Sequence, residues 1–315
     1  MPSTQSQPFT VRVVGPTANT ARFPRLGGML IGGSRDYGDP DYAARIAKHH
    51  FVVLGAWRDF RTPTSNLTLT EAVAYLRTLN PDLRIANYMT VSSADNESTG
   101  AQSDMRDKLY DEVGPPGATR TPNDWWAYDA AGGKILWQSS GKYQVNHSSL
   151  VTPDANGDRY PQWKAKRDFD VFLDGTGVDM IYIDNFRGGE WFSGGADYYR
   201  DGNLRPQAER DALYREAFMA FLAELRALTS NQLPAMVNAT EWINYGYDSL
   251  DPQTDPYEPD RRDFFQLHEG GFMEGMYGES FAFEGTLYDG STNTWGSWGK
   301  MMKQYFNCMR WTQGT

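Results

Sequence analysis

Short apolar runs alternate with amphipathic stretches along most of this chain. Short runs bounded by Gly, Pro and polar residues predict β-strands, whereas apolar positions that recur every three to four residues predict helices. The predicted strands are residues 27–33, 51–56, 84–90, 177–184, 234–240 and 271–275. The predicted helices are residues 41–49, 69–79, 104–113, 161–173, 206–228 and 295–311, and residues 125–138 predict a hairpin with Gly132 and Gly133 at its tip.

Local signals indicate where several of these helices begin. Pro40 suits the first turn of the helix 41–49, because an N–H has no helical partner there. Thr68 and Glu71 have the spacing of a capping box for the helix 69–79. The helix 206–228 has the clearest apolar face, formed by Leu213, Ala217, Phe218, Phe221, Leu222, Leu225 and Leu228.

This alternation of strands and helices predicts an α/β fold with a parallel sheet. A doubly wound sheet and a (β/α)8 barrel both agree with the pattern. Six strands are visible, so a closed eight-stranded barrel needs two more. These would lie in the irregular middle of the chain or in a C-terminal portion beyond its last unit.

The segment 177–187, GVDMIYIDNFR, is an apolar strand that ends abruptly in Asp184 and Asn185. The C-terminal ends of parallel strands are where α/β proteins place their chemistry. Polar side chains also lie at or after the ends of other strands: Asn87, Tyr88, Asn238, Glu241 and Glu274. We therefore expect Asp184 and Glu274 to be two carboxylates that face one cleft.

A pair of carboxylates is what cleavage of a glycosidic bond requires. One group protonates the leaving oxygen and the other attacks the sugar or activates water; separations of about 5–5.5 Å favour retention and about 6.5–9.5 Å favour inversion. The alternative role for Asp184 is a turn cap, because Asp and Asn are common in turns. For Glu274 the alternative is a solvent-exposed position at the edge of the sheet.

Composition excludes several classes of partner. With 315 residues, of which 40% are hydrophobic, the chain can bury a full core, and its net charge of −10 argues against nucleic acids and anionic membranes as partners. No run approaches the ~18 apolar residues of a membrane span. The first residues, MPSTQSQPFTVRVVG, show no signal peptide, so either a signal has been removed or the protein is cytoplasmic. We expect an extracellular or periplasmic location.

Aromatic residues make up 14% of the chain, and many tryptophans lie in Gly- and Asp-rich segments rather than at helical spacing. These are Trp57, Trp125, Trp126, Trp137, Trp191, Trp242, Trp295 and Trp298. Together they predict a cleft whose aromatic faces stack on sugar rings. For any single tryptophan, packing in the core is an equal alternative.

Signals for a metal or cofactor are poor. Asp154, Asn156 and Asp158 copy the start of a calcium loop, but Arg159 stands at the position of the turn glycine and Ala165 at that of the bidentate Glu. We therefore predict an ordinary turn there. The chain has no GxGxxG or Walker loop, no GxSxG and no metal-binding histidine spacing, so we expect no cofactor.

The segments FPRLGGMLIGG, RIANYMT, GVDMIYIDNF and GGFMEGM resemble glycoside hydrolases with a (β/α)8 barrel that are related to the endo-α-1,4-polygalactosaminidase-like enzymes. The resemblance spans roughly residues 24–310. It implies a barrel domain over residues 24–315 after an N-terminal extension, residues 1–23. It also implies that Asp184 is the nucleophile and Glu274 the acid/base of a retaining reaction.

The leading interpretation is therefore a retaining glycoside hydrolase that acts on a polysaccharide or oligosaccharide. The residues expected to bind substrate are Asp36, Trp57, Asn87, Tyr88, Asn185, Arg187, Asn238 and Glu241. One alternative is a carbohydrate-binding barrel without catalysis. Another is a structural protein whose aromatic residues form a protein interface.

Overall fold

The computed structural model describes residues 27–30, 37–55, 67–95, 103–112, 120–122, 124–137, 142–185, 189–190, 194–230, 235–238, 270–272, 285–286 and 292–293. The chain divides into two units. One, Leu26–Trp242 with Leu267–Glu274, holds the main sheet; the other holds a short antiparallel pair, β11 (Gly285–Thr286) and β12 (Thr292–Asn293). The division into an extension, residues 1–23, and one domain, residues 24–315, stays a prediction.

Six parallel strands form the main sheet, and they are paired in the order in which they occur along the chain. They are β1 (Gly27–Leu30), β2 (Phe51–Leu54), β3 (Arg84–Thr90), β8 (Met180–Asp184), β9 (Ala235–Asn238) and β10 (Gly270–Phe272). Each corresponds to one of the strands predicted from sequence. A doubly wound sheet would reverse its strand order at a switch point. These strands show no reversal, so the α/β fold is singly wound here, as the wall of a barrel would be.

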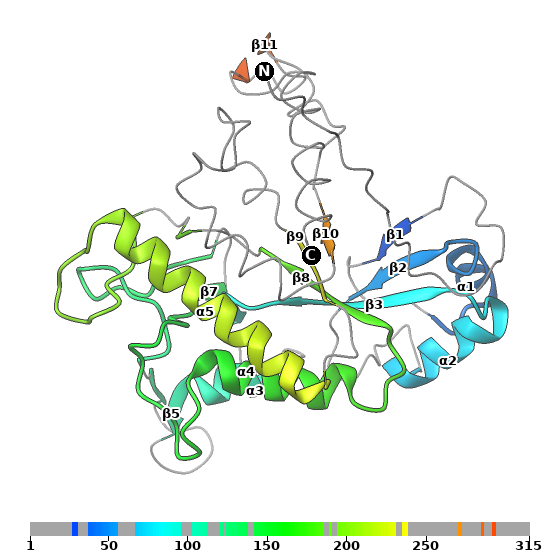
Figure 1. Ribbon diagram of the computed structural model, residues 1–315, viewed down its shortest axis with the longest axis horizontal. Helices are drawn as coiled ribbons and strands as arrows, with labels where there is room; N and C mark the ends of the chain where they lie inside the picture. The colour runs from blue at the N-terminus through cyan, green and yellow to red at the C-terminus, as the bar shows by residue number, and fades with distance from the viewer. Residues whose placement is uncertain are drawn as a thin grey trace, which may run out of the picture. The chain divides into compact units, whose positions relative to one another are not determined.

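Crossover connections between parallel strands are almost always right-handed, so in a sheet paired in chain order they return on the same side. Figure 1 shows α2, α4 and α5 together on one side of the strands. Alternate side chains along the strands project from one face of the sheet and are fully buried, for example Val52, Ile85 and Ile183. The side chains between them project from the other face and form a second cluster, in which Val53, Ala86 and Tyr182 pack with Phe51, Tyr88, Met180 and Met236. The sheet therefore has two distinct faces.

The first two helices begin as their sequence signals predict. The α1 helix (Pro40–Ile46) has Pro40 in its first turn, and the Asp39 carboxylate accepts hydrogen bonds from the backbone N–H groups of Asp41 and Tyr42. The α2 helix (Leu69–Leu79) starts with the predicted capping box. The Thr68 N–H donates to Glu71 Oε2 at 2.7 Å, and the Glu71 N–H donates to Thr68 Oγ1 at 3.2 Å. Pro40 and the capping side chains act on residues close to them in the sequence, which is why the sequence alone locates them.

The remaining helices agree with prediction except for one boundary. The α3 helix (Ser103–Lys108) is shorter than the predicted 104–113, because β5 (Tyr110–Glu112) pairs with β6 (Arg120–Pro122). The α4 helix (Tyr160–Asp168) continues as a π-helical turn, Phe169–Leu173. The α5 helix (Gln207–Leu228) buries Tyr214, Ala217, Phe218, Phe221, Leu222 and Leu225. The predicted helix 295–311 lies outside the described residues.

A long excursion separates β3 from β8. It contains β4 (Ser93–Asp95), which pairs antiparallel with β7 (Lys142–Gln144), and the predicted hairpin. At the hairpin tip the Asp129 N–H donates to the carbonyl of Gly133, and Gly132 has a φ of 83° that favours glycine. Within the described residues, no helix is long and apolar enough to span a bilayer.

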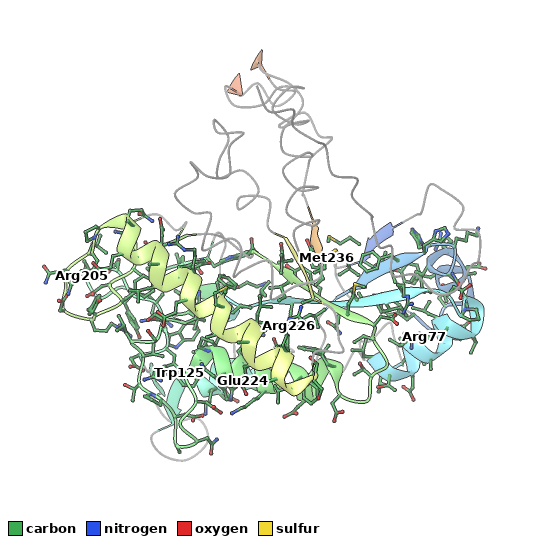
Figure 2. The ribbon with its side chains drawn as sticks, viewed as in Figure 1. Arg77, Trp125, Arg205, Glu224, Arg226 and Met236 are labelled. Carbon is green, nitrogen blue, oxygen red and sulfur yellow. The ribbon has the colours of Figure 1, made fainter. Side chains whose placement is uncertain are left out.

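Asp179 lies immediately before β8 and ties three elements together at the N-terminal end of the sheet. Its carboxylate accepts hydrogen bonds from the Ile85 N–H at 2.8 Å, from Arg77 Nη2 at 2.9 Å and from Arg84 Nη1 at 3.1 Å. Arg77 belongs to α2 (Figure 2), whereas Ile85 and Arg84 belong to β3. This carboxylate thus has a structural role at the end of β8 opposite from Asp184.

Candidate active site

Asp184 is the last residue of β8 and is bonded to a side chain of the neighbouring strand. The Tyr88 hydroxyl, on β3, donates to Asp184 Oδ2 at 2.6 Å. The amide of Asn185 donates to the same oxygen at 3.4 Å. Asn185 has a φ of 54°, a left-handed conformation that Asn tolerates better than most residues and that ends the strand sharply. The sequence-predicted residues Asp184, Asn185 and Tyr88 are therefore brought together.

The Tyr88 ring is itself held in place by packing. It stacks on the ring of Tyr182, with centroids 5.9 Å apart and planes inclined by 23°. Tyr182 is 1% exposed and lies directly beside Tyr88 in the register of the two strands. Because Tyr182 and Asp184 are two residues apart on one strand, they project from the same face.

Thr90 was not singled out from the sequence, although the register places it beside Asp184. Thr90 is half-buried and lies two residues after Tyr88, so the two share a face of β3. The alternation of side chains along the predicted strand 84–90 was the signal that could have found it. The Thr90 side chain therefore projects from the same face of the sheet as Asp184.

Asn87 lies on the opposite face of β3 from Tyr88. Its register partners are Leu54 and Ile181, and its side chain is fully buried. Within the described residues neither its amide nitrogen nor its amide oxygen has a hydrogen-bond partner. This placement favours a role inside the sheet over contact with a substrate, since successive side chains of a strand point to opposite sides.

Several predicted site residues fall outside the described part of the chain: Glu274, Asp36, Trp57, Arg187 and Glu241. Asn238 is the last residue of β9, and its side chain is not described. The strand order nevertheless relates two of the acids to the sheet. Glu241 follows the end of β9, the neighbour of β8, and Glu274 follows the end of β10, the next strand.

The loop between β8 and α5 is anchored by a buried ion pair. Glu190 pairs with Arg210 of α5, its Oε1 accepts a hydrogen bond from the Ala196 N–H at 2.6 Å, and its side chain is 1% exposed. Burial raises the pKa of the Glu190 carboxyl, and the Arg210 guanidinium and the Ala196 N–H act in the opposite direction. Gly195 makes room for this pair: a Cβ there would lie 2.8 Å from Arg210 Cζ. Glu190 thus holds the loop that follows Asp184.

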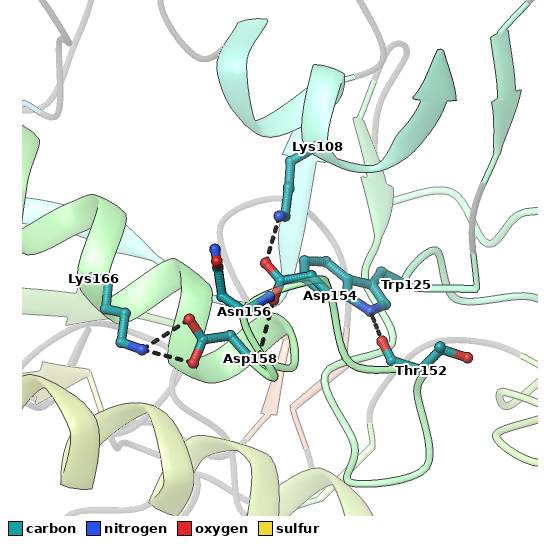
Figure 3. Close-up of polar contacts among 7 residues, drawn as sticks. All are labelled: Lys108, Trp125, Thr152, Asp154, Asn156, Asp158 and Lys166. Atoms are coloured by element: carbon teal, nitrogen blue, oxygen red, sulfur yellow. Dashed lines mark hydrogen bonds and ion pairs between the residues drawn. The ribbon is translucent and has the colours of Figure 1, made fainter. Parts of the chain in front are cut away.

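The segment 154–158 is a turn, as predicted (Figure 3). Asp154 Oδ1 accepts hydrogen bonds from the backbone N–H groups of Asn156 and Asp158, and Oδ2 accepts one from Lys108 Nζ at 2.6 Å. Lys166 Nζ donates to both carboxylate oxygens of Asp158, at 2.7 and 2.8 Å. The ammonium groups of Lys108 and Lys166 thus bind the carboxylates of Asp154 and Asp158, which a calcium ion would need as ligands. In the described ranges, no group of three or more acidic, His or Cys residues could hold a metal ion.

The tryptophans that the structure describes favour the core interpretation in two cases. Trp125 and Trp126 are 2% and 0% exposed, and Trp125 Nε1 donates to the carbonyl of Thr152 at 2.7 Å. Trp137 is half-buried, with the Lys142 ammonium 5.5 Å from the ring centroid. The others, Trp57, Trp191, Trp242, Trp295 and Trp298, lie outside the described residues. Trp125 and Trp126 are therefore core residues rather than surfaces for a sugar.

Comparison with solved structures finds glycoside hydrolases of low sequence identity. The glycoside hydrolase domain of PelA from Pseudomonas aeruginosa is 16% identical, with 92% of this chain and 80% of that chain covered and a TM-score of 0.45. The chitinase domain of the spore coat protein CotE from Clostridium difficile is 13% identical, over 96% of this chain and 65% of that chain, with a TM-score of 0.40. Aspergillus fumigatus Ega3 in complex with galactosamine is 13% identical, over 87% and 86%, with a TM-score of 0.35.

A search of curated proteins finds no match. A family model described as hypothetical glycosyl hydrolase family 15, in contrast, matches residues 77–302. This range includes β3, β8, β9 and β10, and with them Tyr88 and Asp184. Because the match spans well over half of the chain, the protein belongs to hypothetical glycosyl hydrolase family 15 and is a glycoside hydrolase.

Proposed function

We propose that the protein cleaves a polysaccharide or oligosaccharide with retention of configuration, with Asp184 as the nucleophile and Glu274 as the acid/base. The observation that supports this most is the position of Asp184: it ends a central strand of a parallel, chain-ordered sheet and is held by the Tyr88 hydroxyl. The carboxyl ends of such strands are where (β/α) enzymes place catalytic groups. We further propose that the sheet is part of a (β/α)8 barrel.

The proposed reaction has two steps. In the first, an oxygen of Asp184 bonds to the anomeric carbon as the glycosidic bond breaks, and Glu274 gives its proton to the departing oxygen. In the second, Glu274 takes a proton from water, the water oxygen bonds to the anomeric carbon, and the electron pair of the ester bond returns to Asp184. The other proposed substrate contacts are Asp36, Trp57, Asn185, Arg187, Asn238 and Glu241. We also propose that the protein acts on its polymer outside the cytoplasm.

The strand order makes Glu241 the natural rival to Glu274 for the acid/base role. Neighbouring strands lie about 4.8 Å apart. Glu241 follows β9, one strand from Asp184, and Glu274 follows β10, two strands away. A retaining pair needs carboxyl groups about 5–5.5 Å apart. The test therefore has to include both glutamates.

The experiment starts from a panel of polysaccharides with reducing-end detection, applied to the wild type and to Asp184→Asn, Glu274→Gln and Glu241→Gln. Asp179→Asn, which alters a structural carboxylate at the other end of β8, is the matched control. We expect Asp184→Asn and Glu274→Gln to lose hydrolysis and Asp179→Asn to keep it. NMR of the first product should show the anomeric configuration of the substrate.

Each outcome has a definite consequence. Hydrolysis by Asp184→Asn at the wild-type rate would refute the nucleophile assignment, and a product of opposite configuration would refute retention. Azide distinguishes the two glutamates, because it can replace water in an acid/base variant and yield a glycosyl azide of retained configuration. If Glu241→Gln shows this rescue and Glu274→Gln hydrolyses normally, the acid/base is Glu241.

A further inference from the structure

We propose that Tyr88 is a positioning residue for this reaction: its hydroxyl holds the Asp184 carboxylate during attack and receives it again when the covalent intermediate is hydrolysed. The proposal rests on the proposed role of Asp184 as the nucleophile. It departs from the sequence-based expectation that Tyr88 binds sugar hydroxyl groups.

The hydrogen bond itself is the first observation. The distance of 2.6 Å between the Tyr88 hydroxyl and Asp184 Oδ2 is typical of an O–H group that donates to a charged carboxylate. Bonds of this kind are roughly twice as strong as those between neutral groups. The Tyr88 hydroxyl thus donates a charge-assisted hydrogen bond to Asp184 Oδ2.

The second observation is that donor and acceptor are both positioned by β8. The Tyr88 ring packs on Tyr182, and the Tyr88 hydroxyl bonds to Asp184, two residues further along the same strand. Tyr182 is buried, and its register partner is Tyr88 itself. The carboxylate therefore cannot rotate away from Tyr88 without losing the bond, and Tyr88 cannot shift without losing its stack.

The chemical consequence differs between the two steps. Asp184 is an anion before attack and an ester in the intermediate, so the hydrogen bond is weaker in the intermediate than in the free enzyme. When water attacks the anomeric carbon, the ester C–O bond breaks and its electron pair returns to the carboxylate. A donor already aimed at that oxygen stabilises the developing charge, as preorganised donors do elsewhere. Tyr88 should therefore assist hydrolysis of the intermediate more than its formation.

Other ionisable groups on this face lie further along the strands. Among the described strand residues that share the face of Asp184 and Tyr88, they are Tyr182 and, at the N-terminal end of β3, Arg84, whose guanidinium bonds Asp179. A hydrogen bond to a carboxylate favours its charged form. Removal of the Tyr88 hydroxyl should therefore slow the step in which Asp184 regains its charge.

The test is Tyr88→Phe, which keeps the ring stack and removes the hydroxyl. With the polysaccharide that the wild type cleaves, we expect kcat to fall roughly 10- to 100-fold, as for loss of a bond to a charged group. We expect KM to fall with it, because the covalent intermediate accumulates. The matched control is Tyr199→Phe, which removes an exposed hydroxyl that bonds Glu209 at 2.9 Å and should leave both kcat and KM unchanged.

A raised KM with unchanged kcat would show that Tyr88 binds substrate, and would overturn the proposal. So would a lower kcat with an unchanged KM, no accumulated covalent intermediate and a lowered melting temperature, which would indicate a merely structural role. If Tyr88→Phe lowers the melting temperature, the comparison is made well below that temperature, and accumulation of the covalent intermediate is measured directly by mass spectrometry of the protein. An active Asp184→Asn variant would instead refute the proposed nucleophile, so the two failures are distinguishable.

Discussion

Replacement of Asp179 by Ala should destabilise the protein while leaving the chemistry at the opposite end of β8 intact. The substitution removes the acceptor of the Ile85 N–H, a group of a fully buried residue, and two ion pairs with Arg77 and Arg84. These contacts join β3, β8 and α2.

The magnitude follows from how exposed each contact is. An unsatisfied buried N–H costs about 1–3 kcal/mol. The ion pairs are partly solvated, with 33% of the Arg77 and 53% of the Arg84 side chain exposed, so each contributes at most about 0.2–1 kcal/mol. The sum is about 1.4–5 kcal/mol, which lowers Tm by roughly 3 to 20 °C for a domain of this size. Asp179→Asn keeps an oxygen for the Ile85 N–H and should lose about 1 kcal/mol or less.

Thermal unfolding followed by circular dichroism, with wild type, Asp179→Asn and Asp179→Ala side by side, measures this difference. The kcat/KM of each variant, taken well below its Tm, should match that of the wild type. A wild-type Tm for Asp179→Ala would refute the reasoning, because the buried N–H would then have found another partner. Equal losses in the two variants would show that charge, rather than the backbone bond, accounts for the stability.

Three further substitutions test other parts of the fold. Gly195→Ala, where φ is 73° and a Cβ would meet Arg210, should lower Tm by several degrees; an unchanged Tm would contradict the close packing. Burial lowers the pKa of His147 from 6.5 to about 4, so the unfolded chain binds a proton that the folded protein does not, and stability falls as pH drops through that window. In His147→Phe, Tm plotted against pH should therefore be flatter between 6.5 and 4 than in the wild type; parallel curves would refute the argument. Lys164→Met leaves buried Asp168 without one of its cations and should cost about 3 kcal/mol in urea unfolding, whereas an unchanged midpoint would show that the pair contributes little.

Much of the fold could be predicted because its signals are local. The capping box at Thr68 and Glu71 and the apolar face of α5 depend on residues within one or two helical turns of each other. The strand that ends in Asp184 is likewise recognised by a short apolar run. The error at α3 has the opposite origin: Tyr110–Glu112 leaves the helix because it pairs with Arg120–Pro122, a partner that a helical pattern cannot reveal.

The candidate site was predictable only in part. The position of Asp184 at a strand end follows from the sequence, and so does the presence of Tyr88 near the end of β3. Their hydrogen bond does not, because the two residues are 96 positions apart and meet only through the pairing of β3 with β8. The same pairing brings Thr90 next to Asp184, whereas Asn87 lies on the other face because side chains alternate along a strand.

The sequence by itself thus determined the strands, the helix caps and the acid at the tip of β8, since each depends on residues close together along the chain. The tertiary structure decided that the strands pair in chain order rather than as a doubly wound sheet, and that Tyr88 holds Asp184. Strand order and register depend on contacts between segments that are far apart in the sequence. The local pattern of apolar residues does not determine the free energies of those contacts.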